Sequence, residues 1–241
     1  MNVNTRPYIV LNNVSSRLVN GLLISELPPI SKPKQRTRIE TVDGRDGDIV
    51  TPLGFSAYDK TVKIALTYDY DIDDIIEFFN SEGVVVFSNE PDKYYKYAIY
   101  DQIDFERLIR FKTGEVSFHV QPFKYSDNER EKTFTFSGSS KTLTIRNNGN
   151  YYSRPTLTIT GSGAIDLYIN GAQILSINLA VNQTIVINAE TMNATSEDGE
   201  TLLNRLVTGD YDRIILKQGS NTISFTGSVS EILVNNYSRW I

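Results

Sequence analysis

Short runs in which apolar and polar residues alternate recur along most of this 241-residue chain. Alternation with a period of two puts the apolar side chains on one face of an extended strand, so it is typical of strands that are buried on one side. The runs are rich in threonine, isoleucine, valine, tyrosine and phenylalanine, which favour strands. In the first half they are Arg17–Ile24, Thr61–Tyr68, Val84–Ser88, Tyr94–Tyr100 and Glu115–Phe123. The pattern predicts a mainly β protein.

One segment of the first half has a helical period instead. Asp71 or Asp73 is placed to cap its first turn, and Gly83 to stop its end. Its apolar residues recur on one face: Ile72, Ile75, Ile76 and Phe79. A helix between two strands is a β-α-β unit. The first half is therefore predicted to be an α+β domain with one helix on a sheet.

The second half has shorter strands at regular spacing, separated by turns rich in glycine, asparagine and serine. The Asn170–Gly171 pair between two strands is a strong hairpin signal, and only Glu200–Val207 reads as a short helix or turn. This spacing predicts an antiparallel β-sandwich. The expected strands are Thr133–Phe136, Lys141–Arg146, Pro155–Thr160, Ala164–Ile169, Ala172–Ile177, Gln183–Asn188, Arg213–Lys217, Asn221–Thr226 and Ser230–Asn235.

A polar, charged segment, Lys124–Thr133, separates the two halves. We place the boundary at Asn128, which predicts domains over residues 1–128 and 129–241. The first has 15 basic and 19 acidic residues, the second 9 and 10. Neither is the basic module that grips nucleic-acid phosphates. The start of the chain lacks the pattern of a signal peptide, and no apolar run approaches the length that spans a bilayer.

The alternation is lost between Leu27 and Asp48, where three of the eight prolines favour an extended backbone. Basic residues occupy alternate positions in this stretch: Lys32, Lys34, Arg36 and Arg38. An extended chain would put all four on one side. Two interpretations stay open: a solvated loop or charged edge strand, or an arm that reaches onto another subunit. We predict the arm, at about residues 27–48, with these four residues at the subunit contact.

The sequence offers no constellation for catalysis. The chain has no cysteine, which excludes thiolate nucleophiles, zinc-thiolate sites and iron–sulfur clusters. The single histidine, His119, is expected in a strand near a sheet edge and partly buried. Nucleophile-elbow and phosphate-loop motifs are missing. A pair of glycosidase carboxylates leaves no local mark and stays a remote alternative. We expect no enzyme.

Two acidic clusters could suggest a metal. Asp69, Asp71, Asp73 and Asp74 lack the glycine of a calcium loop and lead directly into the expected helix, so helix capping accounts for them better. The other cluster alternates with Gly44 and Gly47 and predicts a tight turn: Asp43, Asp46 and Asp48. We expect no metal and no cofactor.

Tyrosine is abundant, and Tyr94, Tyr95, Tyr97 and Tyr100 are nearly consecutive. Such aromatics cover a sheet face, line a sugar site or form a protein interface. The main alternative function is therefore carbohydrate binding by the C-terminal sandwich. Its candidate aromatic residues are Tyr151, Tyr152, Tyr168 and Trp240, the only tryptophan.

The order of these features resembles the distal tail protein family of long, non-contractile-tailed phages that infect Gram-positive bacteria. The cues in the first half are the run N-G-L-L-I-S-E-L (Asn20–Leu27), a basic linker, the glycine-aspartate turn V-D-G-R-D-G-D-I-V (Val42–Val50) and the helix that follows. In the second half, N-N-G-N-Y-Y-S-R-P-T-L-T-I-T-G (Asn147–Gly161) is similar to the opening of the family's C-terminal domain, and Y-S-R-W-I (Tyr237–Ile241) to its end. The resemblance covers nearly the whole chain.

The resemblance implies a structural hub protein in the virion, at the tail tip, assembled in the host cytoplasm. Six N-terminal domains would form a ring around a channel through which DNA passes without specific binding. Galectin-like C-terminal sandwiches would project from it. The implied partners are further copies of the chain, the tail tube protein, the tail-associated lysin or tail-fibre hub, and receptor-binding or baseplate proteins. Longer family members carry an inserted carbohydrate-binding module, for which this chain has no room.

Overall fold

A computed structural model describes residues 6–80, 82–126, 129, 132–135 and 142–241. The chain divides into two compact units, Met1–Asp127 and Asn128–Trp240. The boundary that we expected at Asn128 lies outside the described residues. Each unit has a hydrophobic core of its own. The predicted mainly β fold, with an α+β first unit and an antiparallel sandwich in the second, is confirmed.

The first unit is built on an antiparallel sheet with strand order β2-β1-β7-β8-β9-β6-β3. The strands are β1 (Ile9–Leu11), β2 (Val14–Ser15), β3 (Leu22–Glu26), β6 (Tyr58–Leu66), β7 (Gly83–Phe87), β8 (Lys93–Ala98) and β9 (Thr113–Ser126). Neighbouring strands alternate in direction, so β6 and β7 on either side of the predicted helix run antiparallel, three places apart in the sheet. The helix therefore connects distant strands of one sheet and does not cross between parallel neighbours.

Aromatic rings fill the centre of this unit. Phe118 is fully buried, and its ring packs edge-on at centroid distances of 5.3 Å from Tyr97, 6.0 Å from Phe87 and 6.4 Å from Phe79. Edge-to-face contacts at these distances are the favoured geometry for aromatic pairs. The tyrosine-rich run thus supplies core residues: Tyr95 and Tyr97 are buried, whereas Tyr100 is exposed.

Helix α1 (Ile72–Phe79) begins as predicted. The Asp71 side chain accepts hydrogen bonds from the backbone N–H groups of Asp73 and Asp74, which satisfies two donors of the first turn. Two details of the prediction are wrong. The helix ends at Asn80, not at Gly83, which opens β7. Its buried residues are Ile75, Phe78 and Phe79, whereas Ile76 is exposed.

A second helix, α2 (Phe105–Phe111), was not predicted. The Asp104 side chain caps its start by accepting from the Arg107 N–H at 2.8 Å. Lys112 ends it in the left-handed conformation, at φ 56°. Leu108 is fully buried, whereas Ile109 and Phe111 are exposed. One buried residue in seven gives too weak a helical period to be recognised in the sequence.

His119 does not lie near a sheet edge as predicted, because β9 lies between β8 and β6. Pro122 falls where the register of β8 and β9 shifts, between the pairs Tyr95↔Lys124 and Tyr97↔Val120, and where pairing with β6 has ended at Val120. A bulge tolerates proline inside a sheet, since no ladder hydrogen bond is needed there. The His119 ring is about one-third exposed and lies 2.8 Å from the Asp59 carboxylate.

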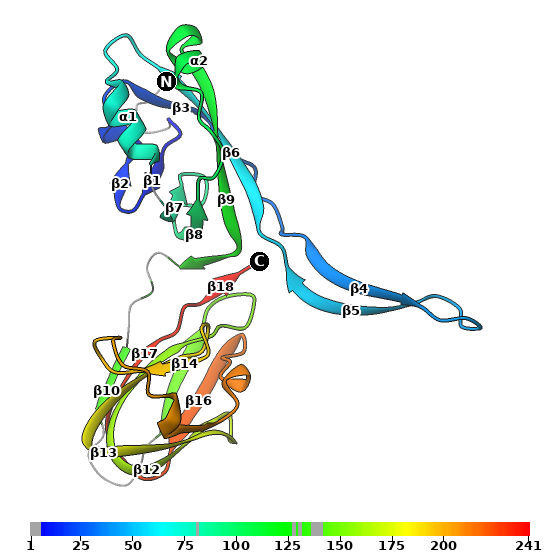
Figure 1. Ribbon diagram of the computed structural model, residues 1–241, viewed down its shortest axis with the longest axis vertical. Helices are drawn as coiled ribbons and strands as arrows, with labels where there is room; N and C mark the ends of the chain where they lie inside the picture. Colours follow the sequence, from blue (N-terminus) through cyan, green and yellow to red (C-terminus); the bar gives the residue numbers. More distant parts are fainter. Residues whose placement is uncertain (1–5, 81, 127–128, 130–131, 136–141) are drawn as a thin grey trace. The chain divides into compact units, whose positions relative to one another are not determined.

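The stretch in which the sequence loses its alternation supplies the first strand and the turn of a β-hairpin. Strands β4 (Gln35–Thr41) and β5 (Asp48–Phe55) pair only with each other and form a separate two-stranded sheet. The turn between them is the glycine-aspartate turn, where Gly44 and Gly47 have positive φ angles of 80° and 76°. The hairpin precedes β6 along the chain and extends away from the first unit's sheet (Figure 1). We call β4, β5 and their turn, residues 35–55, the arm.

The second unit is an antiparallel sandwich of strands β10 to β17. They are β10 (Lys132–Thr135), β11 (Thr142–Asn147), β12 (Thr156–Ile169), β13 (Ala172–Asn188), β14 (Asn193–Thr195), β15 (Val207–Gly209), β16 (Gly219–Phe225) and β17 (Ser228–Asn235), and Arg239–Trp240 form β18. Two residues of the predicted strands lie outside the described residues. They are Phe136, the last residue of Thr133–Phe136, and Lys141, the first residue of Lys141–Arg146. The predicted strand Arg213–Lys217 is wrong: Arg213 ends a 3-10 turn (Tyr211–Arg213), and Leu216 forms an isolated bridge with Ser153.

Two long strands, β12 and β13, take the place of four predicted short ones (Figure 1). The first part of β12 pairs with β17, and its last residues, Leu167–Ile169, pair with β16. The change follows a register shift at Gly161–Gly163, a bulge that lets one strand pass from one side of a sandwich to the other. The predicted hairpin at Asn170–Gly171 is confirmed, with φ angles of 51° and 82°.

The predicted helix or turn at Glu200–Val207 is a single 3-10 turn over Asn204–Leu206. No helix within the described parts of the chain is both long and apolar enough to cross a membrane.

Candidate assembly site

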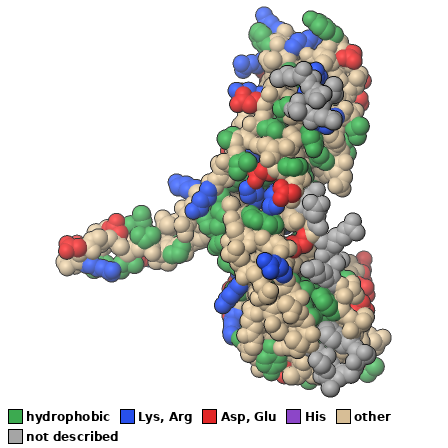
Figure 2. Space-filling view, turned by 180° about the vertical axis from the view of Figure 1, so that it is seen from behind, with side chains coloured by type: hydrophobic (Ala, Val, Ile, Leu, Met, Phe, Trp, Pro, Cys, Tyr) green, Lys and Arg blue, Asp and Glu red, His purple; other side chains and the backbone are tan. Residues whose placement is uncertain are grey.

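The arm exposes apolar side chains on one face. Ile39 lies directly opposite Val50, and both are more than half exposed (61% and 57%). Since side chains two residues apart in a strand share a face, Thr37 and its partner Pro52 lie on this face too. Hydrophobic side chains are visible along the arm in Figure 2. We call the part of this surface formed by Thr37, Ile39, Val50 and Pro52 the apolar arm face; Thr41 and Asp48 continue the same face toward the turn.

The opposite face of the arm carries charged side chains on β4, with Ile49 of β5 opposite Glu40. Arg36, Arg38 and Glu40 alternate along β4, and the Arg38 guanidinium lies 2.6 Å from the Glu40 carboxylate. Arg36 donates a hydrogen bond to the Leu53 carbonyl oxygen at 3.3 Å. Of the four residues predicted at a subunit contact, the structure places these two arginines in β4. Lys32 and Lys34 precede β4 as exposed side chains.

The root of the arm is fixed to the first unit's sheet. Pro28 and Pro33 are buried, and the carbonyl groups around them accept hydrogen bonds from sheet side chains. Lys60 Nζ donates to the Pro29 carbonyl oxygen at 2.8 Å, and Asn89 Nδ2 donates to the Pro28 carbonyl oxygen at 3.0 Å. The segment before the arm is therefore held at several points and does not behave as a free linker.

Lys60 is the unusual residue of this root. Only 3% of its surface is exposed, and its ammonium group lies 5.1 Å from the centre of the Tyr95 ring, within cation–π range. Burial lowers its pKa, and the nearby Glu90 carboxylate opposes that shift. Glu90 accepts from the Tyr95 hydroxyl at 2.7 Å and pairs with Lys124. Every buried polar side-chain atom among the described residues has a hydrogen-bond partner, so this network is satisfied.

Two tyrosines at the root predict a contribution to stability that is lost at high pH. Burial, reinforced by the Glu90 carboxylate, raises the pKa of Tyr95, and burial also raises the pKa of Tyr58. In the unfolded chain these phenols ionise near pH 10, so above about pH 10 the folded state binds more protons. The stability that they contribute is complete below that pH and is lost as the pH rises toward their folded pKa values.

We therefore expect the free energy of unfolding of Tyr95→Phe to fall less steeply than that of the unchanged protein between about pH 9.5 and pH 11, by up to about 1.4 kcal/mol per pH unit for one proton. Urea denaturation at a series of pH values measures this slope. Tyr100→Phe, a change on an exposed side chain, is the matched control. An equal slope for the unchanged protein and Tyr95→Phe would show that a raised pKa of Tyr95 does not cause the loss of stability.

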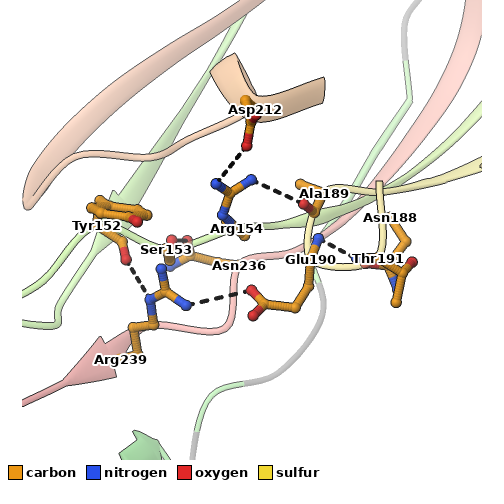
Figure 3. Close-up of polar contacts among 10 residues, drawn as sticks. All are labelled: Tyr152, Ser153, Arg154, Asn188, Ala189, Glu190, Thr191, Asp212, Asn236 and Arg239. Carbon is orange, nitrogen blue, oxygen red and sulfur yellow. Dashed lines mark hydrogen bonds and ion pairs between the residues drawn. The ribbon is translucent and has the colours of Figure 1, made fainter. Parts of the chain in front are cut away.

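A polar cluster ties the C-terminal segment to the sandwich (Figure 3). The Arg239 side chain is buried, and its Nε donates to the Tyr152 carbonyl oxygen at 2.6 Å, while Nη1 lies 3.4 Å from the Glu190 carboxylate. Its guanidinium also packs 4.7 Å from the centre of the Tyr152 ring. Beside it, Arg154 bridges the Ala189 carbonyl oxygen at 3.2 Å and the Asp212 carboxylate at 3.0 Å.

Asn236 is the buried centre of a second set of bonds. Its Nδ2 lies within 3.0 Å of Glu129 Oε1, the Arg146 carbonyl oxygen and Ser238 Oγ, and its Oδ1 accepts from Ser153 Oγ at 3.0 Å. The Glu129 carboxylate accepts in addition from the Ser238 N–H at 2.6 Å. Glu129, the first residue described in this unit, is thus hydrogen-bonded to Asn236 and Ser238 near the C-terminus.

Asn236→Ala is expected to lower the free energy of unfolding of the second unit by roughly 2–4 kcal/mol, because several buried partners lose their bonds at once. Hydrogen exchange resolved along the chain measures this loss and assigns it to the unit. Asn148→Ala, at an exposed asparagine nearby, should cost less than about 0.5 kcal/mol. A small effect of Asn236→Ala, equal to that of the control, would show that the bonds do not hold this segment.

The residues considered for catalysis and metal binding are not assembled into a site. Asp71 caps α1, Asp69 bonds to the Thr67 hydroxyl, and Asp43 and Asp46 lie in the arm's turn. Asp48 accepts from Thr41 across the arm at 2.9 Å. Among the described residues, no group of three or more histidine, cysteine or acidic side chains is arranged to hold a metal ion.

Of the four aromatic candidates for sugar binding, Tyr168 lies in β12 and Trp240 in β18. Tyr151 and Tyr152 pack against each other and against Arg239. A shallow groove of about 690 Å³ does exist on the second unit, beside Gln183 and Glu197, but none of the described residues that line it is aromatic.

Comparison of the sequence with protein-family models and with curated proteins gives no match. Among solved structures, the chain is similar to the Dit protein (gp 19.1) of phage SPP1, described as a paradigm of the hub adsorption apparatus in phages that infect Gram-positive bacteria. The similarity has a TM-score of 0.62 and 15% sequence identity and covers 95% of this chain and 98% of that one. A chain of the phage P2 baseplate, in its activated conformation with Ca, matches with a TM-score of 0.52 and 11% identity, over 95% and 96% of the two chains.

The chain thus has the two-unit β fold found in phage hub and baseplate proteins. The particular fold is that of Dit, as the resemblance to the distal tail protein family predicts, and it extends over nearly the full length of both chains.

Proposed function

We propose that this chain is the structural hub of a long, non-contractile phage tail, where six copies form a ring that joins the tail tube to the adsorption apparatus. The observation that carries the proposal is the match to the SPP1 hub protein over 95% of this chain. The exposed arm supports it, because an apolar arm face open to solvent is typical of a surface that another protein covers. The virion tail tip is the corresponding location.

The charge of the chain suits a ring through which DNA passes. Its formal net charge is −5, and the first 128 residues carry four more acidic than basic residues. Acidic walls repel phosphates, whereas basic walls would bind them. The first unit would form the channel, and the sandwiches would contact receptor-binding or other baseplate proteins. The role is structural and needs no catalytic residue or cofactor.

The mass of the purified protein in solution tests the proposal. Light scattering should give about 163 kDa, which is six times 27.2 kDa, or a multiple if two rings pair. Negative-stain images should then show closed rings, since a head-to-tail contact gives a ring when its rotation closes. A protein that stays monomeric at high concentration and low salt would overturn the proposal.

The basic residues of the arm should contribute to this contact. We expect Arg36→Glu with Arg38→Glu to raise the concentration needed for half-assembly about tenfold, equivalent to about 1.4 kcal/mol, because two attractions become repulsions. Single exposed ion pairs contribute about 0–1 kcal/mol and weaken in salt. Light scattering over a series of protein concentrations measures this shift. The series is repeated at salt concentrations from about 0.05 M to about 0.5 M, and the difference between the two proteins should shrink as salt rises.

The matched control is Arg205→Glu with Arg213→Glu, which makes the same charge change at exposed positions of the second unit. It should leave assembly unchanged. If the arm variant assembles as well as the unchanged protein throughout the salt range, the arginines do not lie at the contact.

A further inference from the structure

One outer face of the sandwich is rich in hydroxyl and amide groups. Strands β11, β16, β12, β13 and β15 lie side by side in this order, and β12 contributes its last residues. Alternate side chains of these strands, such as Leu167 of β12 and Ile223 of β16, are buried in the core of the unit. The side chains between them therefore point outward. We call this outward surface the polar sheet face.

The pairing of the strands arranges the polar sheet face in three rows that run across it. Two rows follow from the residues that lie opposite each other on neighbouring strands, extended by the hydrogen bond from the Asn170 N–H to the Thr222 carbonyl oxygen. The third includes Thr226, whose N–H donates to the Asp166 carbonyl oxygen at 3.0 Å. The first row is Thr144, Thr222 and Asn170, the second is Thr142, Ser224, Tyr168 and Gln173, and the third is Thr226, Asp166, Ser176 and Thr208.

These rows carry little charge. Asp166 is their only charged side chain, although 22% of the residues of the chain are charged. Arg146 is the next charged side chain along β11, opposite Ser220 and outside the rows. A surface that meets only water usually carries about 25–35% charged residues. Hydroxyl and amide groups both donate and accept hydrogen bonds, so a dense, uncharged array of them suits an uncharged ligand with the same groups.

Tyr168 gives this face an aromatic surface. It is half-buried in the middle row, between Ser224 of β16 and Gln173 of β13. A tyrosine ring offers apolar area with a polar group at one end. A sugar ring is complementary to this arrangement, because its C–H groups form an apolar face and its hydroxyl groups surround that face. One aromatic ring among hydroxyl and amide groups therefore matches a sugar.

A network of hydrogen bonds holds polar groups beside the tyrosine. One oxygen of the Asp166 carboxylate accepts from Ser176 Oγ at 2.6 Å and from Gln173 Nε2 at 3.1 Å, and the other accepts from Thr226 Oγ1 at 3.2 Å. Gln173 Nε2 also lies 3.1 Å from Ser176 Oγ. The Gln173 amide next to Tyr168 is thus oriented before a ligand arrives. Groups that are fixed in advance lose less conformational entropy on binding.

The groove of about 690 Å³ on the same unit suits an uncharged sugar less well. Glu197 and Asp198 both line it, and none of the described residues that line it is aromatic. It offers two negative charges and no ring on which a sugar can stack. The polar sheet face is therefore the stronger candidate for a glycan.

We propose that the polar sheet face binds an uncharged polysaccharide, with Tyr168 stacked on a sugar ring and with Asp166 and Gln173 hydrogen-bonded to its hydroxyl groups. This goes beyond the hub function, because it gives the chain a direct contact with a glycan. The site lies within one unit of one copy and needs no ring. Its failure would consequently leave the ring proposal standing, and the reverse is also true.

Saturation-transfer NMR on the full-length protein tests the proposal. The probes are neutral hexasaccharides of glucose, galactose and N-acetylglucosamine, with hexagalacturonate as the acidic comparison. Each is titrated to about 10 mM, because a flat face with few contacts binds weakly. We expect at least one neutral probe to bind and hexagalacturonate not to bind. Binding of none of the neutral probes, or of hexagalacturonate alone, would overturn the proposal.

Variants then locate the bound sugar. Tyr168→Ala should raise the dissociation constant of the neutral probe at least tenfold, whereas Tyr168→Phe, which keeps the ring, should bind nearly as well as the unchanged protein. Tyr100→Ala, at an exposed tyrosine of the first unit, is the matched control and should bind normally. Gln173→Ala, at an exposed position, should also weaken binding and gives a second result if circular dichroism shows that Tyr168→Ala is misfolded. Unchanged binding by folded Tyr168→Ala, or by Gln173→Ala where Tyr168→Ala is misfolded, would place the sugar elsewhere and overturn the proposal.

Discussion

Replacing Ile39 and Val50 together by aspartate is expected to abolish ring formation while each copy stays folded. Both side chains lie on the apolar arm face, opposite each other and exposed in the single chain, so the change costs the monomer little. In an assembled ring the same positions would be covered, and an unpaired carboxylate buried in an apolar contact costs several kcal/mol. Every contact around the ring would carry two of them. Light scattering measures the loss, and circular dichroism confirms the fold.

The control for this variant is Thr51→Asp. Thr51 pairs with Arg38 on the charged face of the same hairpin, so a carboxylate there adds charge to the arm without entering its apolar face. It should assemble close to normally. If the Ile39/Val50 variant forms rings as readily as Thr51→Asp does, the apolar arm face does not take part in assembly.

Phe118→Ala is expected to lower the free energy of unfolding of the first unit by about 3–5 kcal/mol, the usual range for removing a buried phenylalanine ring. The ring is fully buried and contacts Phe79, Phe87 and Tyr97 edge-on, so its loss leaves a cavity that rigid neighbours cannot fill. Urea denaturation measures the total loss. Hydrogen exchange should show it in the first unit only, because the second unit has a separate core.

Phe111→Ala serves as the comparison. This side chain is 59% exposed at the end of α2, so the same truncation should cost less than about 1 kcal/mol. Equal losses for the two variants would mean that Phe118 is not the centre of the core. A loss shared by both units would mean that the units unfold as one.

The elements that could be predicted are those whose residues face a core on one side. The strands of both units alternate because one face of each is buried, and the Asp71 cap and the Asn170–Gly171 turn carry local chemistry that acts in any context. Helix α2 was missed because its contact with the core is mainly Leu108. The sequence predicted two short strands in place of β12, because the glycines of its bulge resemble a turn.

The arm could not be recognised as a hairpin for a related reason. Neither of its faces meets a core of the same chain, so β4 reads Q-R-T-R-I-E-T and lacks the usual alternation of apolar and polar residues. The hydrogen bonds at the root of the arm could not be predicted from the sequence either. Lys60 occupies an ordinary position in a strand pattern, and its partner is a backbone carbonyl 31 residues away. Whether Lys32, Lys34, Arg36 and Arg38 contact a neighbour stays a prediction, because a single chain contains only one side of that contact.

The buried root of the arm has a thermodynamic consequence for association. A flexible tether would lose conformational entropy each time it became ordered on a partner, at about 1–2 kcal/mol per backbone residue fixed. Here Lys60 and Asn89 already hold the carbonyl groups of Pro29 and Pro28, so folding has fixed the exit of the arm before any partner arrives. Preorganisation of this kind strengthens binding without adding a contact. Loosening the root by Lys60→Met would therefore weaken association although Lys60 is buried within its own chain.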